Sequence, residues 1–124
     1  MPTAAAASKC IASLTYQQKG GDLGKLALPE DVPAEIQDCG GRACQVQADI
    51  KIVVQKDGSV AVEGVTMTSD SAVAPDVLSE RMRRWLSGLH YDPPMLRGDP
   101  VCVRLEWIYG FAKTAPKNMK QPTP

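Results

Sequence analysis

The stretch that decides the fold is QVQADIKIVVQKDGSVAVEGVTM, which runs from Gln45 to Met67. In its first half apolar and polar side chains alternate, which is the period of a β-strand with one buried face. The polar segment Lys56-Asp57-Gly58 separates this run from a second apolar run that begins at Val60. Two such runs joined by a short loop with a glycine predict an antiparallel hairpin.

The positions of the apolar residues, at every second residue of each strand, determine the length of the loop in this hairpin. Residues that lie opposite each other in an antiparallel pair point to the same face of the sheet. A two-residue loop would place Val54 opposite Ala61, whereas a three-residue loop with Gly58 in the left-handed conformation pairs Val54 with Val60. We therefore expect the three-residue loop. Further along, the apolar positions match only if one extra residue is inserted, which predicts a β-bulge at Glu63-Gly64.

After the hairpin the apolar spacing changes to that of a helix. Apolar residues recur at intervals of four, three and four residues: Leu78, Met82, Trp85 and Leu89. Pro75 suits the first helical turn, and Gly88 followed by Pro93-Pro94 ends the helix. The opposite side of this segment is polar, so we expect an amphipathic helix that covers one face of a sheet.

The most regular alternation of the chain runs from Val101 to Phe111 and predicts a long final strand. The element order is therefore strand, strand, helix, strand. It defines an α+β fold in which a small antiparallel three-stranded sheet packs on one helix. Residues 1–44 form an irregular lead segment, residues 45–112 the folded domain and residues 113–124 a mobile tail.

The overall composition excludes several functional classes. Lysine plus arginine equals aspartate plus glutamate at 14 each, so no strong field marks the chain as a binder of nucleic acid. No apolar run approaches the roughly 18 to 20 residues that cross a bilayer, so the chain as given is not expected to span a membrane. We expect no enzyme activity, catalytic residue, metal or cofactor, because the single histidine, His90, has no neighbouring ligand or nucleophile in the pattern.

Four cysteines in a chain of this length favour two disulfides and an oxidising compartment. Three pairings are possible, and four free thiols in a cytosolic protein are the alternative. We favour Cys39 with Cys44, because the glycines between them allow a tight loop, and therefore Cys10 with Cys102. In the alternation Cys102 lies on the face opposite Trp107, so we expect the lead segment to fold over the outer face of the sheet.

Three short motifs stand between the expected elements: Asp57-Gly58-Ser59-Val60, Leu89-His90-Tyr91-Asp92-Pro93 and Gly98-Asp99-Pro100-Val101. Their order and spacing, from about Ala48 to Phe111, resemble the C-terminal domain of the TonB family. The Trp that family members often have near the second motif is replaced by Leu89, and the family's Tyr-Pro lead-in is missing.

The resemblance implies a periplasmic or secreted module that binds a protein or peptide partner. In that family the domain accepts an extended peptide of an outer-membrane receptor as an added strand beside its last strand, during energy-coupled transport. An unpaired strand edge offers the backbone groups that such binding requires. The resemblance places the partner-binding contacts on the final strand: Val101, Val103, Arg104, Leu105, Glu106 and Ile108.

Two alternatives stay open at this point. The chain shows neither the membrane anchor nor the proline-rich spacer that energy transduction needs, so a freestanding TonB-like or TolA-like adaptor, assembly or inhibitor protein is the second function. The expected edge could also pair with a second copy of the chain as a homodimer, or be covered by residues 1–44.

Overall fold

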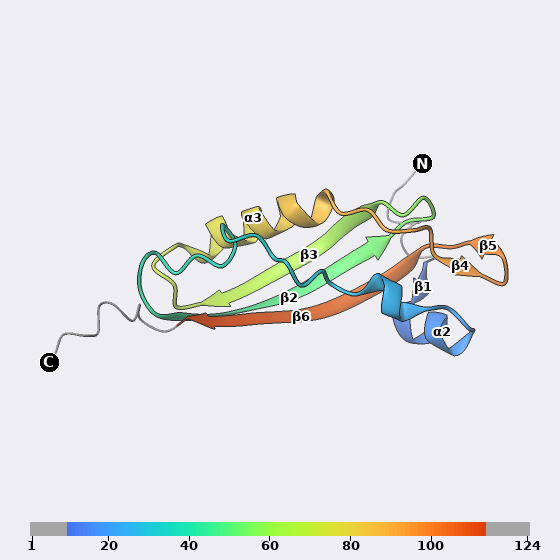
Figure 1. Ribbon diagram of the computed structural model, residues 1–124, viewed down its shortest axis with the longest axis horizontal. Coiled ribbons are helices and arrows are strands. Elements are labelled where there is room, and N and C mark those ends of the chain that lie inside the picture. Colours follow the sequence, from blue (N-terminus) through green and yellow to red (C-terminus); the bar gives the residue numbers. More distant parts are fainter. Residues whose placement is uncertain (1–9, 114–124) are drawn as a thin grey trace, which may run out of the picture.

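A four-stranded sheet forms the framework of the protein (Figure 1). The computed structural model describes residues 10–113. Across the sheet lie, in order, β1 (Ile11–Ala12), β6 (Val103–Lys113), β2 (Cys44–Val54) and β3 (Val60–Ser69). The three long strands are antiparallel, whereas β1 runs parallel to β6. The order strand, strand, helix, strand is confirmed, but the prediction of a three-stranded sheet missed β1.

The register of the hairpin is as predicted. Val54 lies opposite Val60, and the backbone N–H of Gln55 donates to Ser59 at 2.8 Å, which closes a three-residue loop. Gly58 has a φ of 89°, in the left-handed region. The register shifts by one residue at the predicted bulge, and beyond it Ile50 again faces an apolar residue, Val65. Apolar side chains therefore stay on one face along both strands.

Helix α3 (Pro75–Ser87) lies along this apolar face, which we call the inner face of the sheet (Figure 1). Pro75 occupies the first turn and Gly88 the C-cap, as expected. Leu78, Met82 and Leu86 are fully buried. Leu78 and Met82 belong to the predicted stripe, whereas Trp85 and Leu89 of that stripe are only partly buried and Leu89 lies beyond the helix. The helix contacts β3 in particular.

The lead segment completes the core and is more ordered than the sequence predicts. It contains β1, helix α2 (Ser13–Gln18) and a short 3₁₀ helix, η1 (Leu23–Leu26). Its buried residues Tyr16, Leu26, Val32 and Ile36 join the cluster formed by the inner-face strand residues and α3. The expectation that this segment folds over the outer face is therefore wrong. The inner face is wider than one helix, and the lead segment buries the remainder.

A second, two-stranded sheet precedes β6 and was not predicted. It pairs β4 (Met95–Leu96) with β5 (Asp99–Pro100). The two residues between them, Arg97 and Gly98, have φ values of 56° and 87°. Positive φ at both central positions defines the tight turn that suits a twisted hairpin. The predicted start of the final strand at Val101 is therefore two residues too early, because the chain first forms this hairpin and β6 begins at Val103.

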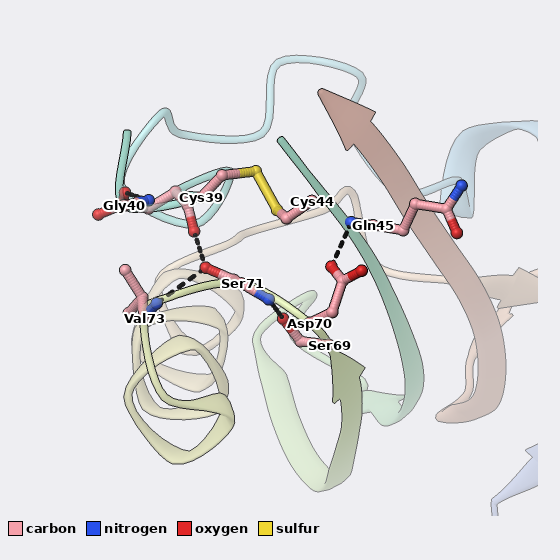
Figure 2. The surroundings of a disulfide bond; sticks show 9 residues. Cys39, Gly40, Cys44, Gln45, Ser69, Asp70, Ser71 and Val73 are labelled. Atoms are coloured by element: carbon pink, nitrogen blue, oxygen red, sulfur yellow. Dashed lines mark hydrogen bonds between the residues drawn. A yellow bond between two sulfur atoms is a disulfide. The ribbon is translucent and has the colours of Figure 1, made fainter. Parts of the chain in front are cut away.

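Both favoured disulfides are present: Cys10–Cys102 and Cys39–Cys44. The first joins the residue before β1 to the residue before β6, and it therefore fastens β1 to the edge of the sheet. The second closes a tight loop at the opposite end of β6 and β2 (Figure 2). The mobile tail predicted for residues 113–124 lies outside the described residues, except for Lys113, which ends β6.

The two disulfides should differ in their effect on stability. Cys10 and Cys102 are 92 residues apart, whereas Cys39 and Cys44 are five apart. Loop-closure entropy then gives a contribution of about 4 to 5 kcal/mol for the long loop and about 2 kcal/mol for the short one. We expect Cys10→Ala/Cys102→Ala to lower the free energy of unfolding about twice as much as Cys39→Ala/Cys44→Ala. Urea unfolding measures both, and equal losses would contradict the expectation.

The hairpin loop should be intolerant of a side chain at Gly58. A Cβ there would collide with the carbonyl oxygen of Tyr91, and its left-handed backbone adds strain. We expect Gly58→Ala to cost more than about 1 kcal/mol. Gly64 is the matched control, because a Cβ at that position meets nothing within 4 Å. Thermal unfolding should show Gly64→Ala near the wild type, and a similar loss in both variants would refute this account.

Candidate functional site

The outer edge of β6 is paired with the protein only at its beginning. On its other side β6 pairs with β2 along its full length, without a register shift. At the outer edge β1 covers Val103 and Arg104, and among residues 10–113 no other strand pairs with it. The edge expected to be free from Val101 onward is therefore occupied at its start and begins further along the strand.

Alternation along β6 determines which backbone groups face this edge. The N–H of Ile11 in β1 donates to the carbonyl of Cys102 at 2.9 Å, so residue 102 presents its carbonyl outward. In a strand, the N–H and C=O groups of one residue point to the same side, and those of the next residue point to the other side. The residues that point away from β2 beyond β1 are Glu106, Ile108, Gly110 and Ala112. We call this stretch of backbone the open edge.

The six residues predicted for partner binding fall into three groups. Val101 precedes the strand, and its N–H donates to the carbonyl of Pro94 at 2.8 Å. Val103 and Leu105 are buried on the inner face. Arg104, Glu106 and Ile108 lie on the opposite, outer face, where the pattern placed them. Of the six, only Glu106 and Ile108 belong to the open edge.

Arg104 already has an intramolecular partner. Its guanidinium lies 3.7 Å from the carboxylate of Glu63, with the two side chains 50% and 29% exposed. Val53, which is opposite Arg104 in the register, is buried although it is on the outer face. The side chain of Arg104 therefore covers part of the outer face, in addition to any contact with a partner.

The two edges of the sheet differ in their suitability for strand addition. Strand β3 forms the far edge, and it contains the bulge at Glu63-Gly64. Near its start, Ser59 forms a bridge with His90, and the N–H of Tyr91 donates to Gly58 at 2.8 Å. A bulge and a covering segment are the devices by which proteins protect an edge. The open edge of β6 has neither over its length.

Side chains on both faces flank the open edge. Ile108 on the outer face is 76% exposed, which is unusual for a large apolar side chain. On the inner face the aromatic residues Trp107, Tyr109 and Phe111 are half-buried against the core clusters. Tyr109 also accepts a hydrogen bond from the amide of Gln37 at 2.6 Å. A strand added here would meet an apolar outer-face residue and a row of partly covered rings.

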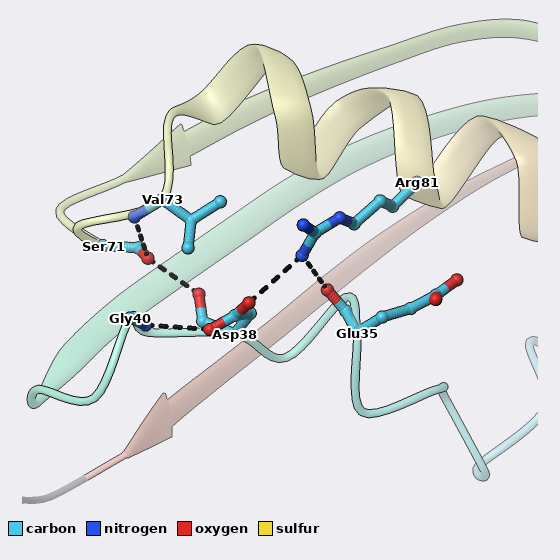
Figure 3. A network of polar contacts seen from close by, with 6 residues as sticks. All are labelled: Glu35, Asp38, Gly40, Ser71, Val73 and Arg81. Carbon is cyan, nitrogen blue, oxygen red and sulfur yellow. Dashed lines mark hydrogen bonds and ion pairs between the residues drawn. The ribbon is translucent and has the colours of Figure 1, made fainter.

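A polar network fastens the lead segment at the far end of this edge. Arg81 of α3 donates to the carbonyl of Glu35 at 2.7 Å and to the carboxylate of Asp38 at 3.2 Å (Figure 3). The hydroxyl of Ser71 donates to the carbonyl of Asp38 at 2.7 Å. The Cys39–Cys44 disulfide then links the residue after Asp38 to the first residue of β2 (Figure 2). The end of the sheet beside the open edge is thereby held rigid.

No family model, curated protein or solved structure matches the chain in comparisons with known proteins. Within residues 10–113 no helix is long and apolar enough to cross a membrane. Over the same residues, no three His, Cys, Asp or Glu side chains lie together as metal ligands. What the chain does must therefore be argued from the edge itself.

Asp38 should make the stability depend on acid pH. The N–H of Gly40 and then the guanidinium of Arg81 hold the pKa of this carboxyl below its usual value of 3.8. Because the pKa is lower in the folded protein, the carboxylate stabilises the fold above pH 3.8, and this contribution is lost as the pH falls through the folded-state pKa. We expect Asp38→Asn to destabilise the protein near neutral pH and to match the wild type in strong acid. Urea unfolding across this range tests it, and a constant difference would contradict the role of the charge.

Proposed function

We propose that this chain is a peptide-binding module in which the open edge accepts an extended peptide as a further strand. The observation that carries the proposal is the regular backbone from Glu106 to Ala112, which no strand within residues 10–113 pairs on its outer side, whereas the far edge of the sheet is bulged. Addition of a strand to a sheet edge is an established mode of peptide recognition. It is also the mode that the resemblance to the TonB C-terminal domain implies.

The energetics favour reversible binding in which side chains add to the backbone contacts. Four outward residues offer up to eight backbone hydrogen bonds, each with a net contribution of about 0.5 to 1.5 kcal/mol. Ordering an extended peptide costs about 1 to 2 kcal/mol per residue, which offsets much of this gain. Burial of Ile108, now 76% exposed, contributes up to about 1.5 to 3 kcal/mol. The peptide must therefore carry apolar side chains as well as a free backbone.

The two disulfides are typical of proteins from an oxidising compartment. We propose the periplasm as this compartment and an outer-membrane receptor as the source of the peptide. Both follow from the resemblance to the TonB family. Strand addition itself needs only the open edge and is tested separately from them.

Replacement of Ile108 distinguishes backbone pairing from side-chain contact. The N–H of Ile108 points away from β2, so Ile108→Pro removes one donor of the open edge while leaving the bonds to β2 in place. The probe is a displayed library of random peptides of about twelve residues. At roughly 3.4 Å per residue, a peptide of this length spans the edge. We expect selected peptides to lose binding to Ile108→Pro and to retain most of it with Ile108→Val, which keeps the backbone N–H and most of the apolar side chain.

Amide hydrogen exchange gives a readout that does not depend on a substitution. In the complex the amides of Glu106, Ile108, Gly110 and Ala112 should become protected, whereas the alternate amides, already bonded to β2, should change little. Uniform protection along β6, or protection only on β3, would reject strand addition at the open edge.

A further inference from the structure

An open depression lies on the outer face of the sheet and reaches the open edge. Its volume is about 620 Å³. Its lining, from three neighbouring strands and the residue after β3, includes Gln45, Gln47, Thr68, Asp70, Gly110 and Ala112 together with the apolar Val46 and Phe111. The register places Gln47 between Gly110 and Thr68, and Gln45 beside Ala112. The depression therefore combines polar side chains of the outer face with parts of Val46 and Phe111, and it meets the edge at two residues with almost no side chain.

The small residues of β6 make this depression accessible from the edge. Strands lie about 4.8 Å apart, so β2 is about 10 Å from a strand added beside β6. At Gly110 no side chain stands between them. A Cβ at Gly110 would lie 3.3 Å from the carbonyl oxygen of Val46, which disfavours a larger residue there. A long side chain of an added peptide can thus lie across Gly110 and approach the polar groups of β2.

Two carboxylates lie in or beside the depression in the part of the chain that the structure describes. Asp70 lies in the lining, and Asp49 is exposed in the adjacent row, opposite Ile108. Within residues 10–113 neither carboxylate forms a salt bridge. The carboxylate of Asp70 accepts a hydrogen bond from the N–H of Gln45 at 2.7 Å, which directs it toward β2 (Figure 2).

The basic side chains of the neighbouring strands lie in other rows of the sheet. Arg104 pairs with Glu63. Lys51 lies beside Glu106 in the register, and the charge of Lys113 acts on Asp38. The rows that contain Gly110 and Ala112 therefore combine amide and hydroxyl groups with the carboxylate of Asp70 and no lysine or arginine, and the adjacent row adds Asp49.

We propose that the peptide accepted at the open edge carries a lysine or arginine opposite Gly110, whose side chain crosses Gly110 toward Gln47 and is attracted by Asp70 in the depression and by Asp49 in the adjacent row. This specificity rests on the proposed strand addition, because the added strand presents the side chain. Lysine and arginine combine a long apolar stem with a charged donor group. The stem covers Ile108 and Gly110, and the charged group lies between the rows that contain the two carboxylates.

The test uses peptides selected from the random library on the wild-type protein. Selected peptides should share a lysine or arginine at one position, and its replacement by glutamine should weaken binding about fivefold, the upper range for an exposed ion pair. On the double variant Asp49→Asn/Asp70→Asn the same replacement should have no effect. Asp92→Asn is the control, because Asp92 is exposed and belongs to the chain next to the Gly58 turn, away from the depression.

The outcomes separate this specificity from strand addition itself. Peptides that bind without a shared cationic residue, and whose binding is lost in Ile108→Pro, overturn the specificity and leave strand addition intact. An equal effect of the glutamine replacement on the wild type and on Asp49→Asn/Asp70→Asn also overturns it. If no peptide is selected, or if binding is insensitive to Ile108→Pro, strand addition and the specificity fall together.

Discussion

The structure depends on covering an apolar sheet face that is longer than its helix. Strands β2 and β6 have 11 residues each, which extend for about 37 Å. Helix α3 has 13 residues and extends for about 20 Å. One helix therefore leaves much of the inner face exposed to water. The lead segment buries this remainder through Tyr16, Leu26, Val32 and Ile36, and the two disulfides and the contacts of Arg81 hold it there.

This covering makes the molecule asymmetric in a way that favours edge binding. The lead segment lies on the inner face with α3, so the outer face has no covering layer in residues 10–113. Strand β1 then occupies only the first two residues of the β6 edge. The same arrangement that completes the core leaves the adjoining edge and outer face to solvent.

The strands and helix with a clear period could be predicted from the sequence, because a buried and a solvated face impose different residue types. This was sufficient for the hairpin loop and the bulge, where one parity change identified Glu63-Gly64. The lead segment has no such signal, since its buried residues are spaced by ten, six and four positions. Its conformation is determined by tertiary contacts. The Arg97-Gly98 turn was missed because each strand of that hairpin has only two residues.

The candidate edge, too, could be predicted from the sequence only in part. Alternation identified the side chains on the outer face, including Glu106 and Ile108. It could not show that β1 occupies Val103 and Arg104, because a pairing of two residues has no periodicity. The depression at Gly110 depends on the register of three strands, so it becomes visible only when they are assembled.

The Cys10–Cys102 disulfide also determines how the protein transmits mechanical tension. A pulling force applied between the two ends of the chain passes from Cys10 directly through the sulfur atoms to Cys102 and then along β6. Residues 11–101 lie outside this covalent path and are shielded from extension. If the force acted instead between one end of the chain and a peptide paired along β6, it would run parallel to the strand, so the hydrogen bonds to the peptide would be sheared together rather than opened one at a time.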